Sequence, residues 1–586
     1  MMRLQALVHE WPPALGTPLR ASEVAFALCL QMREPSTDDR HRWLAALAAH
    51  QWGRGHACLD LLGLQDNPAD WLGWLPGQVQ RLPADVAAGV ADCPWIVGAD
   101  SPLVWVHGEG FSRLYLRRAW QAEQSIRASL LARLQAPPEP PQAVEDSLKT
   151  LFAPLAHSAQ QREACRLAAH TRVSLITGGP GTGKTTTVVR LLALLLMGQG
   201  PGASALRIHL AAPTGKAAAR LGESIAQARQ DLPEAVRAHI PADVQTLHRL
   251  LQSVPEDHTL ATDVVVVDEA SMIDLEMMAR LLAAVPLHAR LVLLGDRDQL
   301  ASVEAGAVLT QLGQSPWLAP YTVRLTHSHR FRPDGGIGAW ARAVQESPEA
   351  LPALWDSLES LEWQAQGQDR VQRWPLSGEG HAGALRPLLQ QGWADWWQGL
   401  QAPLGGEACD DAKALSLLAA FARFGVLCAL REGPWGVAQL NHRIAKALGL
   451  GRPGQEWYVG RPVMVTRNDY TLGRMNGDIG LTLPTADGQL RVAFANGKGG
   501  VHWVSPARLG LVETVFALTV HKSQGSEFGH VLLVLPQDVE APVLTRELVY
   551  TGMTRARQTL SLWLPQPAVL WQACARTVRR SGGLDT

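Results

Sequence analysis

The sequence predicts an α/β protein whose central strands run parallel and are covered by helices on both faces. A phosphate-binding loop at residues 178–185 stands between an apolar run and a leucine-rich run. Four consecutive valines at 264–267 lead into two carboxylates, and an apolar run at 290–294 leads into a polar segment. Short, β-branched runs without charges are typical of buried parallel strands, and ligands collect at the carboxyl ends of such strands. The three polar strand ends therefore predict a nucleotide site.

The phosphate loop reads GGPGTGKT and fits the pattern G-x-x-x-x-G-K-[S/T]. Residues 173–177 are expected to form the strand that enters it, and residues 186–196 the helix that leaves it. Glycines let the backbone wrap an anion, so that successive N–H groups point at a phosphate. Lys184 adds a charge for the β- and γ-phosphates, and the Thr185 hydroxyl suits a Mg²⁺ ligand. We expect the loop to bind the nucleotide through Gly178, Gly179, Pro180, Gly181, Thr182, Gly183, Lys184, Thr185 and Thr186.

Two carboxylates, Asp268 and Glu269, follow the valine run. Asp268 is placed to hold Mg²⁺ through water, and Glu269 to orient or deprotonate the attacking water. An Asp-Glu pair at a strand end is commonly only a solvated edge. Because a phosphate loop precedes this pair in the chain, the catalytic interpretation is favoured.

Three residues farther along the chain suit a transferring phosphoryl group. Gln299 follows the third strand, where a neutral amide can sense the γ-phosphate. Arg330 and Arg555 carry planar guanidinium groups that match phosphate oxygens. Each arginine alone is more often a surface salt-bridge residue, so it is the combination and order of these segments that indicates a catalytic set.

That order resembles the superfamily-1 helicases and, within them, the RecD family, the alpha subunit of exodeoxyribonuclease V. Two segments, residues 427–441 and 461–480, resemble RecD specifically. The resemblance implies ATP and Mg²⁺ as cofactors, and it implies two RecA-like lobes that close on the nucleotide. The helicase motifs would be 178–185 (I), 212–218 (Ia), 246–251 (Ib), 268–271 (II), 295–299 (III), 330–331 (end of IV), 519–528 (V) and 554–557 (VI).

The resemblance also implies further ligand contacts. Gln161 is similar to the adenine-reading glutamine of the family, although Gln160 beside it leaves this assignment open by one position. Glu527 in motif V is expected to contact the nucleotide. Motifs Ia, Ib and V carry hydroxyl, amide and basic groups that suit the DNA backbone, and a buried capping role is the alternative for any one of them. The DNA candidates are Thr214, Lys216, Thr246, His248, Thr519, His521 and Lys522.

The function that the resemblance implies is ATP-dependent 5′→3′ translocation on single-stranded DNA at duplex ends, in double-strand-break repair and recombination. RecB-like and RecC-like subunits would be the partners, with the nuclease in the beta subunit. Three alternatives stay open: a free-standing RecD-like DNA helicase, an RNA helicase of the same superfamily, and an ATP-gated binding switch without translocation. An ABC-type ATPase is disfavoured because the LSGEG segment at 376–380 follows the aspartate strand, and a GTPase because the chain has no Asn-Lys pair.

Proline- and glycine-rich segments, which interrupt regular secondary structure, predict the domain boundaries. A mainly helical N-terminal domain is expected over 1–134 and a proline-rich linker over 135–147. The first RecA-like lobe would cover 148–335 and the second 336–454 and 516–586, with a small SH3-like β-barrel inserted at 455–515. Residues 364–413, rich in Gly, Gln and Pro, are expected to be loop-like.

Residues 1–134 carry no catalytic motif, and we expect them to dock on the partner subunits. Their tryptophans either fill a small core or supply interface contacts, for which this residue type is favoured. These are Trp11, Trp43, Trp52, Trp71, Trp74, Trp95, Trp105 and Trp120.

The composition is that of a globular protein, with 47% hydrophobic and 18% charged residues in a chain of 586. The longest uncharged apolar stretch is too short to span a bilayer, and no export signal is visible at the N-terminus. Seven cysteines are scattered without a Cys-x-x-Cys pair, which favours free thiols over metal sites. We therefore expect a cytoplasmic protein with no membrane partner.

Overall fold

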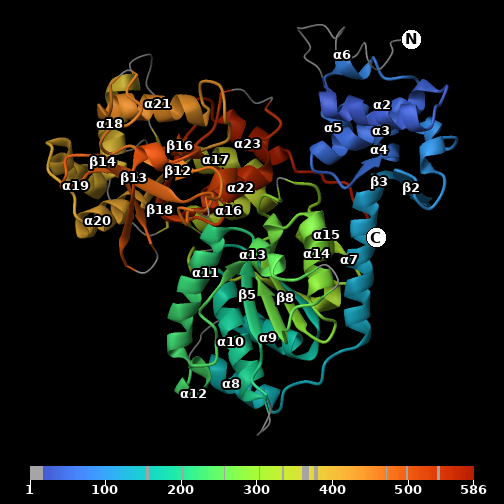
Figure 1. The fold of residues 1–586 in the computed structure, drawn as a ribbon, viewed down its shortest axis with the longest axis horizontal. Helices are drawn as coiled ribbons and strands as arrows, with labels where there is room; N and C mark the ends of the chain where they lie inside the picture. The colour runs from blue at the N-terminus through green and yellow to red at the C-terminus, as the bar shows by residue number, and fades with distance from the viewer. Residues whose placement is uncertain are drawn as a thin grey trace.

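A six-stranded parallel sheet forms the first lobe, drawn mainly in green at the bottom of Figure 1. The strand order is β6-β5-β7-β8-β4-β9. The strands are β4 (Val173–Gly178), β5 (Ile208–Ala212), β6 (Gln245–Thr246), β7 (Val264–Val267), β8 (Arg290–Gly295) and β9 (Thr322–Leu325). The computed structural model describes residues 18–153, 158–199, 204–255, 258–302, 304–332, 335–358, 369–374, 381–452, 454–469, 471–496, 499–537 and 541–585.

Helices cover both faces of this sheet, as the uncharged strands predicted. Val264 and Val266 of β7 pack into one hydrophobic cluster, whereas Val265 and Val267 pack into another. Because alternate side chains of a strand point to opposite faces, a strand buried on both sides has to be apolar throughout. One face is covered by α8 (Val144–Phe152), α9 (Ala159–His170), α10 (Lys184–Met197) and α11 (Gly215–Ala228), and the other by α7 (Arg117–Gln135), α13 (Leu247–Gln252), α14 (Leu275–Ala284) and α15 (Val308–Gln314).

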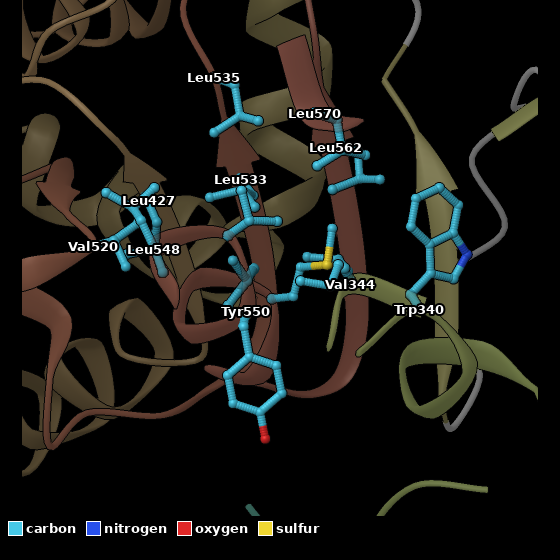
Figure 2. Packing of buried hydrophobic residues seen from close by; sticks show 14 of the residues in the cluster. Trp340, Val344, Leu427, Val520, Leu533, Leu535, Leu548, Tyr550, Leu562 and Leu570 are labelled. Atoms are coloured by element: carbon cyan, nitrogen blue, oxygen red, sulfur yellow. The ribbon is translucent and has the colours of Figure 1, made fainter. Parts of the chain in front are cut away.

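A second parallel sheet, of five strands, forms the second lobe, drawn in orange and red in Figure 1. Its order is β10-β19-β18-β11-β17. The strands are β10 (Arg370–Arg373), β11 (Phe424–Cys428), β17 (Ala517–Thr519), β18 (Phe528–Val534) and β19 (Ala556–Trp563). Figure 2 shows the core on one face, where Leu427, Leu533 and Leu562 of the sheet meet side chains from three helices. Those helices are α16 (Gly336–Glu346), α22 (Arg546–Thr554) and α23 (Ala568–Ala575).

The expectation of loop-like structure over 364–413 was wrong for the described part of that segment. It contains β10, α18 (His381–Gly392) and α19 (Ala394–Leu404), and α20 (Asp411–Phe421) begins within it. Proline lies inside both α18 and α19, which is why composition pointed away from helices. Tertiary packing outweighs that bias: Trp393 stacks on Phe421 with ring centroids 5.4 Å apart, and Trp396 is fully buried beside them. These helices cover the second face of the lobe, together with α21 (Val437–Leu448).

A five-stranded antiparallel sheet interrupts the second lobe, where a small β-barrel was expected. Its order is β15-β14-β13-β12-β16, so β15 and β16 are its two edges. Val463, Val492 and Phe494 fill its own small core. The strands are β12 (Pro462–Val465), β13 (Ile479–Pro484), β14 (Leu490–Ala495), β15 (Val501–Val504) and β16 (Val512–Thr514). We refer to this sheet and its loops as the insertion.

The N-terminal domain, in blue at the upper right of Figure 1, packs helices on a three-stranded sheet of order β1-β3-β2. Every described tryptophan of residues 18–134 is buried or half-buried, so these rings fill cores; Trp11 lies outside the described residues. The main elements are α2 (Ala21–Arg33), α3 (Asp39–Gly53), β1 (Cys58–Asp60), β2 (Leu103–Gly108) and β3 (Phe111–Leu116).

Helix α7 leaves this domain and runs down the side of the first lobe against α14 (Figure 1). Its Ile126 and Leu130 belong to the same hydrophobic cluster as Leu291 and Leu293 of β8. The chain after α7 passes through the proline-rich segment, and α8 already begins at Val144. Helix α7 is therefore part of the wall of the first lobe.

The C-terminal residues return to the same wall. Ser581 accepts a hydrogen bond from the backbone of Ala57 at 2.8 Å, and Leu584 is buried in the cluster that contains Ile126. Gly583 donates its N–H to the buried carboxylate of Glu123, whose pKa is raised to about 7 by burial. The tail thus ties the second lobe to the first. Within the described ranges, none of the helices has the length and apolar character needed to cross a bilayer.

Candidate nucleotide site and nucleic-acid surface

The phosphate loop connects β4 to α10, and its backbone geometry requires glycine. Gly181 and Gly183 have φ angles of +77° and +81°, which lie in the left-handed region. A Cβ atom at Gly183 would lie 2.2 Å from Nε2 of Gln161, and one at Gly181 would lie 2.4 Å from Cβ of Arg330. The Lys184 ammonium donates to the carbonyl oxygens of Gly178 at 2.5 Å and Gly179 at 3.2 Å. The lysine therefore rests on its own loop.

The two adjacent glutamines have different surroundings. Gln161 is buried and donates to the carbonyl oxygen of Thr182 in the phosphate loop at 3.1 Å. The amide of Gln160 instead pairs with Thr326, donating to its hydroxyl at 2.9 Å and accepting from its backbone N–H at 2.8 Å. This geometry favours Gln161 over Gln160 as the residue that faces a nucleotide.

Asp268 and Glu269 lie at the carboxyl end of β7, beside the loop. Burial, together with the neighbouring charge of Glu269, raises the pKa of Asp268 to about 6 against the opposing influence of Lys184. A cation bound between Asp268 and the Thr185 hydroxyl would relieve that unfavourable burial, so these oxygen donors fit Mg²⁺. Glu269 has φ +52° and ψ +38°, a conformation that non-glycine residues rarely adopt and that recurs at functional sites.

Gln299 joins the first lobe to the second. Its Nε2 donates to Oδ2 of Asp296 at 2.9 Å, and its Oε1 accepts from Nη2 of Arg555 at 2.7 Å. Arg555 follows α22 in the second lobe, and both side chains are buried. The amide and the guanidinium that were predicted to contact the γ-phosphate thus contact each other across the cleft.

Glu527 gathers three arginines in the same cleft. Arg330 donates to its Oε1 and Arg557 to its Oε2, both at 2.8 Å, and Arg220 pairs with it from α11. Burial alone would raise the pKa of Glu527, but Arg220 and Arg330 outweigh burial and lower the pKa to about 2. Sequence reasoning missed Arg220. It lies four residues after Lys216 on the same helix, so helical periodicity from motif Ia was the signal that could have found it.

These groups line one cavity of about 630 Å³ between the lobes. Gly178 and Gly179 do not line it; their carbonyl oxygens accept hydrogen bonds from Lys184. The predicted residues that the structure brings to this cavity are Gln161, Pro180, Gly181, Thr182, Gly183, Lys184, Thr185, Thr186, Asp268, Glu269, Gln299, Arg330, Glu527 and Arg555.

The hydroxyls among the DNA candidates have structural partners. Thr214 caps α11 and Thr246 caps α13, each accepting a backbone N–H, and Thr519 accepts from the N–H of Lys522 at 3.2 Å. A capping contact uses the oxygen as an acceptor and leaves the hydroxyl proton for another partner. Capping and phosphate contact are therefore compatible at all three positions.

The basic DNA candidates differ in exposure. His248 is exposed, whereas burial lowers the pKa of the half-buried His521. Lys216 lies against the insertion, with its Cε 3.6 Å from the position of a Cβ on Gly477, and burial lowers its pKa to about 8. Lys522 pairs with Glu513 at 2.6 Å.

A second cavity, of about 1070 Å³, lies between α21 and the insertion. Thr519 and Lys522 line it, which connects it to motif V. Its wall also carries four exposed basic side chains that the sequence analysis did not single out: Arg431, His442, Lys446 and Arg452. Lys446 and His442 stand four residues apart on one face of α21, a helical spacing that could have marked them.

Comparisons with known proteins agree with this layout. Family models match at residues 17–115 (RecBCD enzyme subunit RecD, N-terminal domain), 156–362 (AAA domain) and 514–563 (UvrD-like helicase C-terminal domain). The RecBCD enzyme subunit RecD of Mycobacterium tuberculosis is 38% identical, over 95% of this chain and 93% of that protein. The ATP-dependent RecD2 DNA helicase of Deinococcus radiodurans is 30% identical, over 94% of this chain and 69% of that protein. A Bacteroides Pif1 structure bound to single-stranded DNA is 15% identical, covering 71% of this chain and 94% of that one, with a TM-score of 0.36.

Proposed function

This chain belongs to the family of RecBCD enzyme subunit RecD, and we propose that it is an ATP-dependent DNA helicase that moves 5′→3′ along one strand. It would act at duplex ends within a RecBCD-type helicase–nuclease, in double-strand-break repair and recombination. The main support for this function is the cleft between the two parallel-sheet lobes. There the phosphate loop and Glu269 of one lobe face Arg555 of the other.

When ATP binds, side chains that otherwise contact other protein groups would contact its phosphates instead. Lys184 would move from its loop carbonyls to the β- and γ-phosphates, and Arg330 from Glu527 to the transferring group. Mg²⁺ between Thr185 and Asp268 would neutralise phosphate charge. Glu269 would orient and deprotonate the attacking water, while Arg555 stabilises the charge that develops on the γ-phosphoryl oxygens.

Hydrolysis would drive motion because Arg555 and Lys184 come from different lobes. With the γ-phosphate present both side chains bind it and the cleft stays closed; after hydrolysis that link weakens and the cleft opens. Motifs Ia and Ib move with the first lobe, and motif V moves with the second. Two surfaces that bind the same strand would therefore shift relative to each other in every cycle.

A streptavidin-displacement assay tests the direction. The full chain is given single-stranded oligonucleotides with biotin at either the 3′ or the 5′ end, and the release of streptavidin is followed with ATP. A 5′→3′ motor releases it from the 3′ end. Release from the 5′ end alone would overturn the direction, and DNA-stimulated ATPase without release would identify a binding switch. Stronger stimulation by RNA than by DNA would favour the RNA helicase alternative.

The DNA surface is tested through salt. Each phosphate contact releases counterions, so removing one should reduce the slope of log affinity against log salt by about one unit. We expect Lys216→Ala and Lys522→Ala each to reduce the slope for single-stranded DNA by about that amount, measured by fluorescence anisotropy. Lys149→Ala, on the exposed face of α8, serves as the matched control. Unchanged slopes in both test variants would mean that neither lysine contacts a phosphate. Lys216 would then serve only to contact the insertion, and Lys522 only to pair with Glu513.

The partner subunits, RecB-like and RecC-like proteins, are proposed to dock on the N-terminal domain. Its described tryptophans are buried or half-buried, but Met32 and Val97 are 78% and 75% exposed, and Leu75 is 52% exposed. Trp95 donates to the carbonyl oxygen of Glu34 at 2.9 Å and so ties the end of α2 to the segment before Val97. Because a contiguous exposed apolar patch marks a contact site, the two segments joined by this hydrogen bond, with Met32 on one and Val97 on the other, are the proposed docking patch.

Substitution tests this docking better than truncation, because deleting residues 1–134 would remove α7 and uncover the core of the first lobe. We expect the double variant Met32→Glu, Val97→Glu to lose co-purification with the RecB-like and RecC-like proteins while its DNA-stimulated ATPase is retained. Leu287→Glu, at a 54% exposed position on the first lobe, is the control. If the double variant still assembles with its partners as well as the wild type does, the docking surface does not include Met32 and Val97.

A further inference from the structure

Tyr550 connects the core of the second lobe to the nucleotide site of the first. It lies on α22 and is only 4% exposed. Figure 2 shows its ring at the margin of the hydrophobic cluster, with the hydroxyl oxygen pointing away from the other labelled side chains. That hydroxyl donates to Oδ2 of Asp296 at 3.1 Å, and Asp296 belongs to the first lobe, just after β8.

Asp296 in turn fixes the amide of Gln299. Its Oδ2 accepts from Nε2 of Gln299 at 2.9 Å, and its Oδ1 accepts from the backbone N–H of Asp298 at 3.1 Å. An amide whose NH₂ group is held by a carboxylate must present its oxygen to the opposite side. On that side Oε1 of Gln299 meets Arg555. The orientation of the predicted γ-phosphate sensor therefore depends on Asp296.

The backbone next to Gln299 is also held by the second lobe. The N–H of Leu300 donates to the hydroxyl of Thr551 at 2.9 Å, and its carbonyl oxygen accepts from Nε2 of Gln524 at 2.9 Å. The Tyr550 hydroxyl reaches the phosphate loop as well, since a Cβ atom on Gly179 would lie 2.8 Å from its oxygen. Opening of the cleft would break all of these contacts together.

Resting on the function proposed above, we propose that Tyr550 is a positioning residue: its hydroxyl holds Asp296 so that Gln299 faces the γ-phosphate only when the two lobes are closed. Both partners are buried, so the loss of this hydrogen bond would leave a buried polar group without a partner, which is unfavourable. Burial raises the pKa of Tyr550. Burial also raises the pKa of Asp296, where Lys184 opposes it. The phenol is thus a donor throughout the working pH range.

Removing the hydroxyl alone tests the proposal. In the full chain with saturating poly-dT, Tyr550→Phe is expected to lower kcat for ATP by about tenfold, the size expected for a hydrogen bond to a charged group, with KM changed less than about twofold. Tyr115→Phe is the matched control, since its hydroxyl also pairs with a buried carboxylate, that of Glu123, far from the cleft. Equal kcat in Tyr550→Phe and wild type, measured well below both melting temperatures, would leave Tyr550 with a packing role only.

A double-mutant cycle tests the route through Gln299. If Tyr550 acts by orienting that amide, Tyr550→Phe should have no further effect on kcat in a Gln299→Ala background. If the two substitutions instead lower kcat independently, so that their fold-changes multiply in the double variant, Tyr550 does not act through Gln299. Failure of the broader function is distinguishable, because it would appear in the wild-type chain as the absence of DNA-stimulated ATPase.

Discussion

Replacing Lys184 by glutamine is expected to lower kcat for ATP hydrolysis by about 10²–10³-fold, the usual loss when one preorganised electrostatic contact to a transition state is removed. The loop itself should persist, because the backbone of Gly181 and Gly183 shapes it and Lys184 only donates to two loop carbonyls. Glutamine has a similar length and can still donate to one of those carbonyls. Steady-state ATPase with saturating single-stranded DNA is the measurement.

The control for this prediction is Lys413→Gln, at an exposed position on α20 outside both cavities. Melting temperatures of both variants should match that of the wild type within a degree or two. Wild-type hydrolysis by a folded Lys184→Gln protein would mean that the loop does not hold the phosphates. A large fall in melting temperature would instead show that the lysine stabilises the loop.

The local parts of the nucleotide site were predictable from sequence because each is encoded in a few consecutive residues. The strand–loop–helix unit needs an apolar run, glycines in the left-handed region and a helix start, and β4 and α10 follow that order. The four valines of β7 likewise indicate a central strand by themselves, since a strand that is apolar at every position is typically buried on both faces.

Contacts between the lobes could not be predicted in this way. Arg220 and Glu527 are far apart in the chain, and so are Asp296 and Tyr550, so no local pattern links them. The same limit applies to α7, whose sequence indicates a helix but not that Ile126 and Leu130 pack on the first lobe. The helices α18 and α19 were missed for a related reason, because the stacking of Trp393 on Phe421 outweighs their proline content.

Replacing Glu269 by glutamine should separate binding from chemistry. Loss of a general base typically costs about 10²–10⁴-fold in rate, so kcat should fall by that order. Nucleotide binding should persist, because the amide is isosteric and the strained backbone at φ +52° is unchanged. The substitution also removes a negative charge beside Asp268, one of the causes that raise the pKa of that carboxyl, so the metal-binding group becomes easier to ionise.

The consequence for motion follows from which step is blocked. A Glu269→Gln protein that binds ATP without hydrolysing it should accumulate with Arg555 and Lys184 on the same γ-phosphate and the lobes closed. Single-turnover hydrolysis, affinity for a fluorescent ATP analogue, and the distance between labels on α11 and α21 would be measured together. Slow hydrolysis with tight binding and a short distance is the expected combination. Weak ATP binding would instead assign Glu269 to nucleotide or metal binding, and an open cleft with ATP bound would remove Arg555 as the link between lobes.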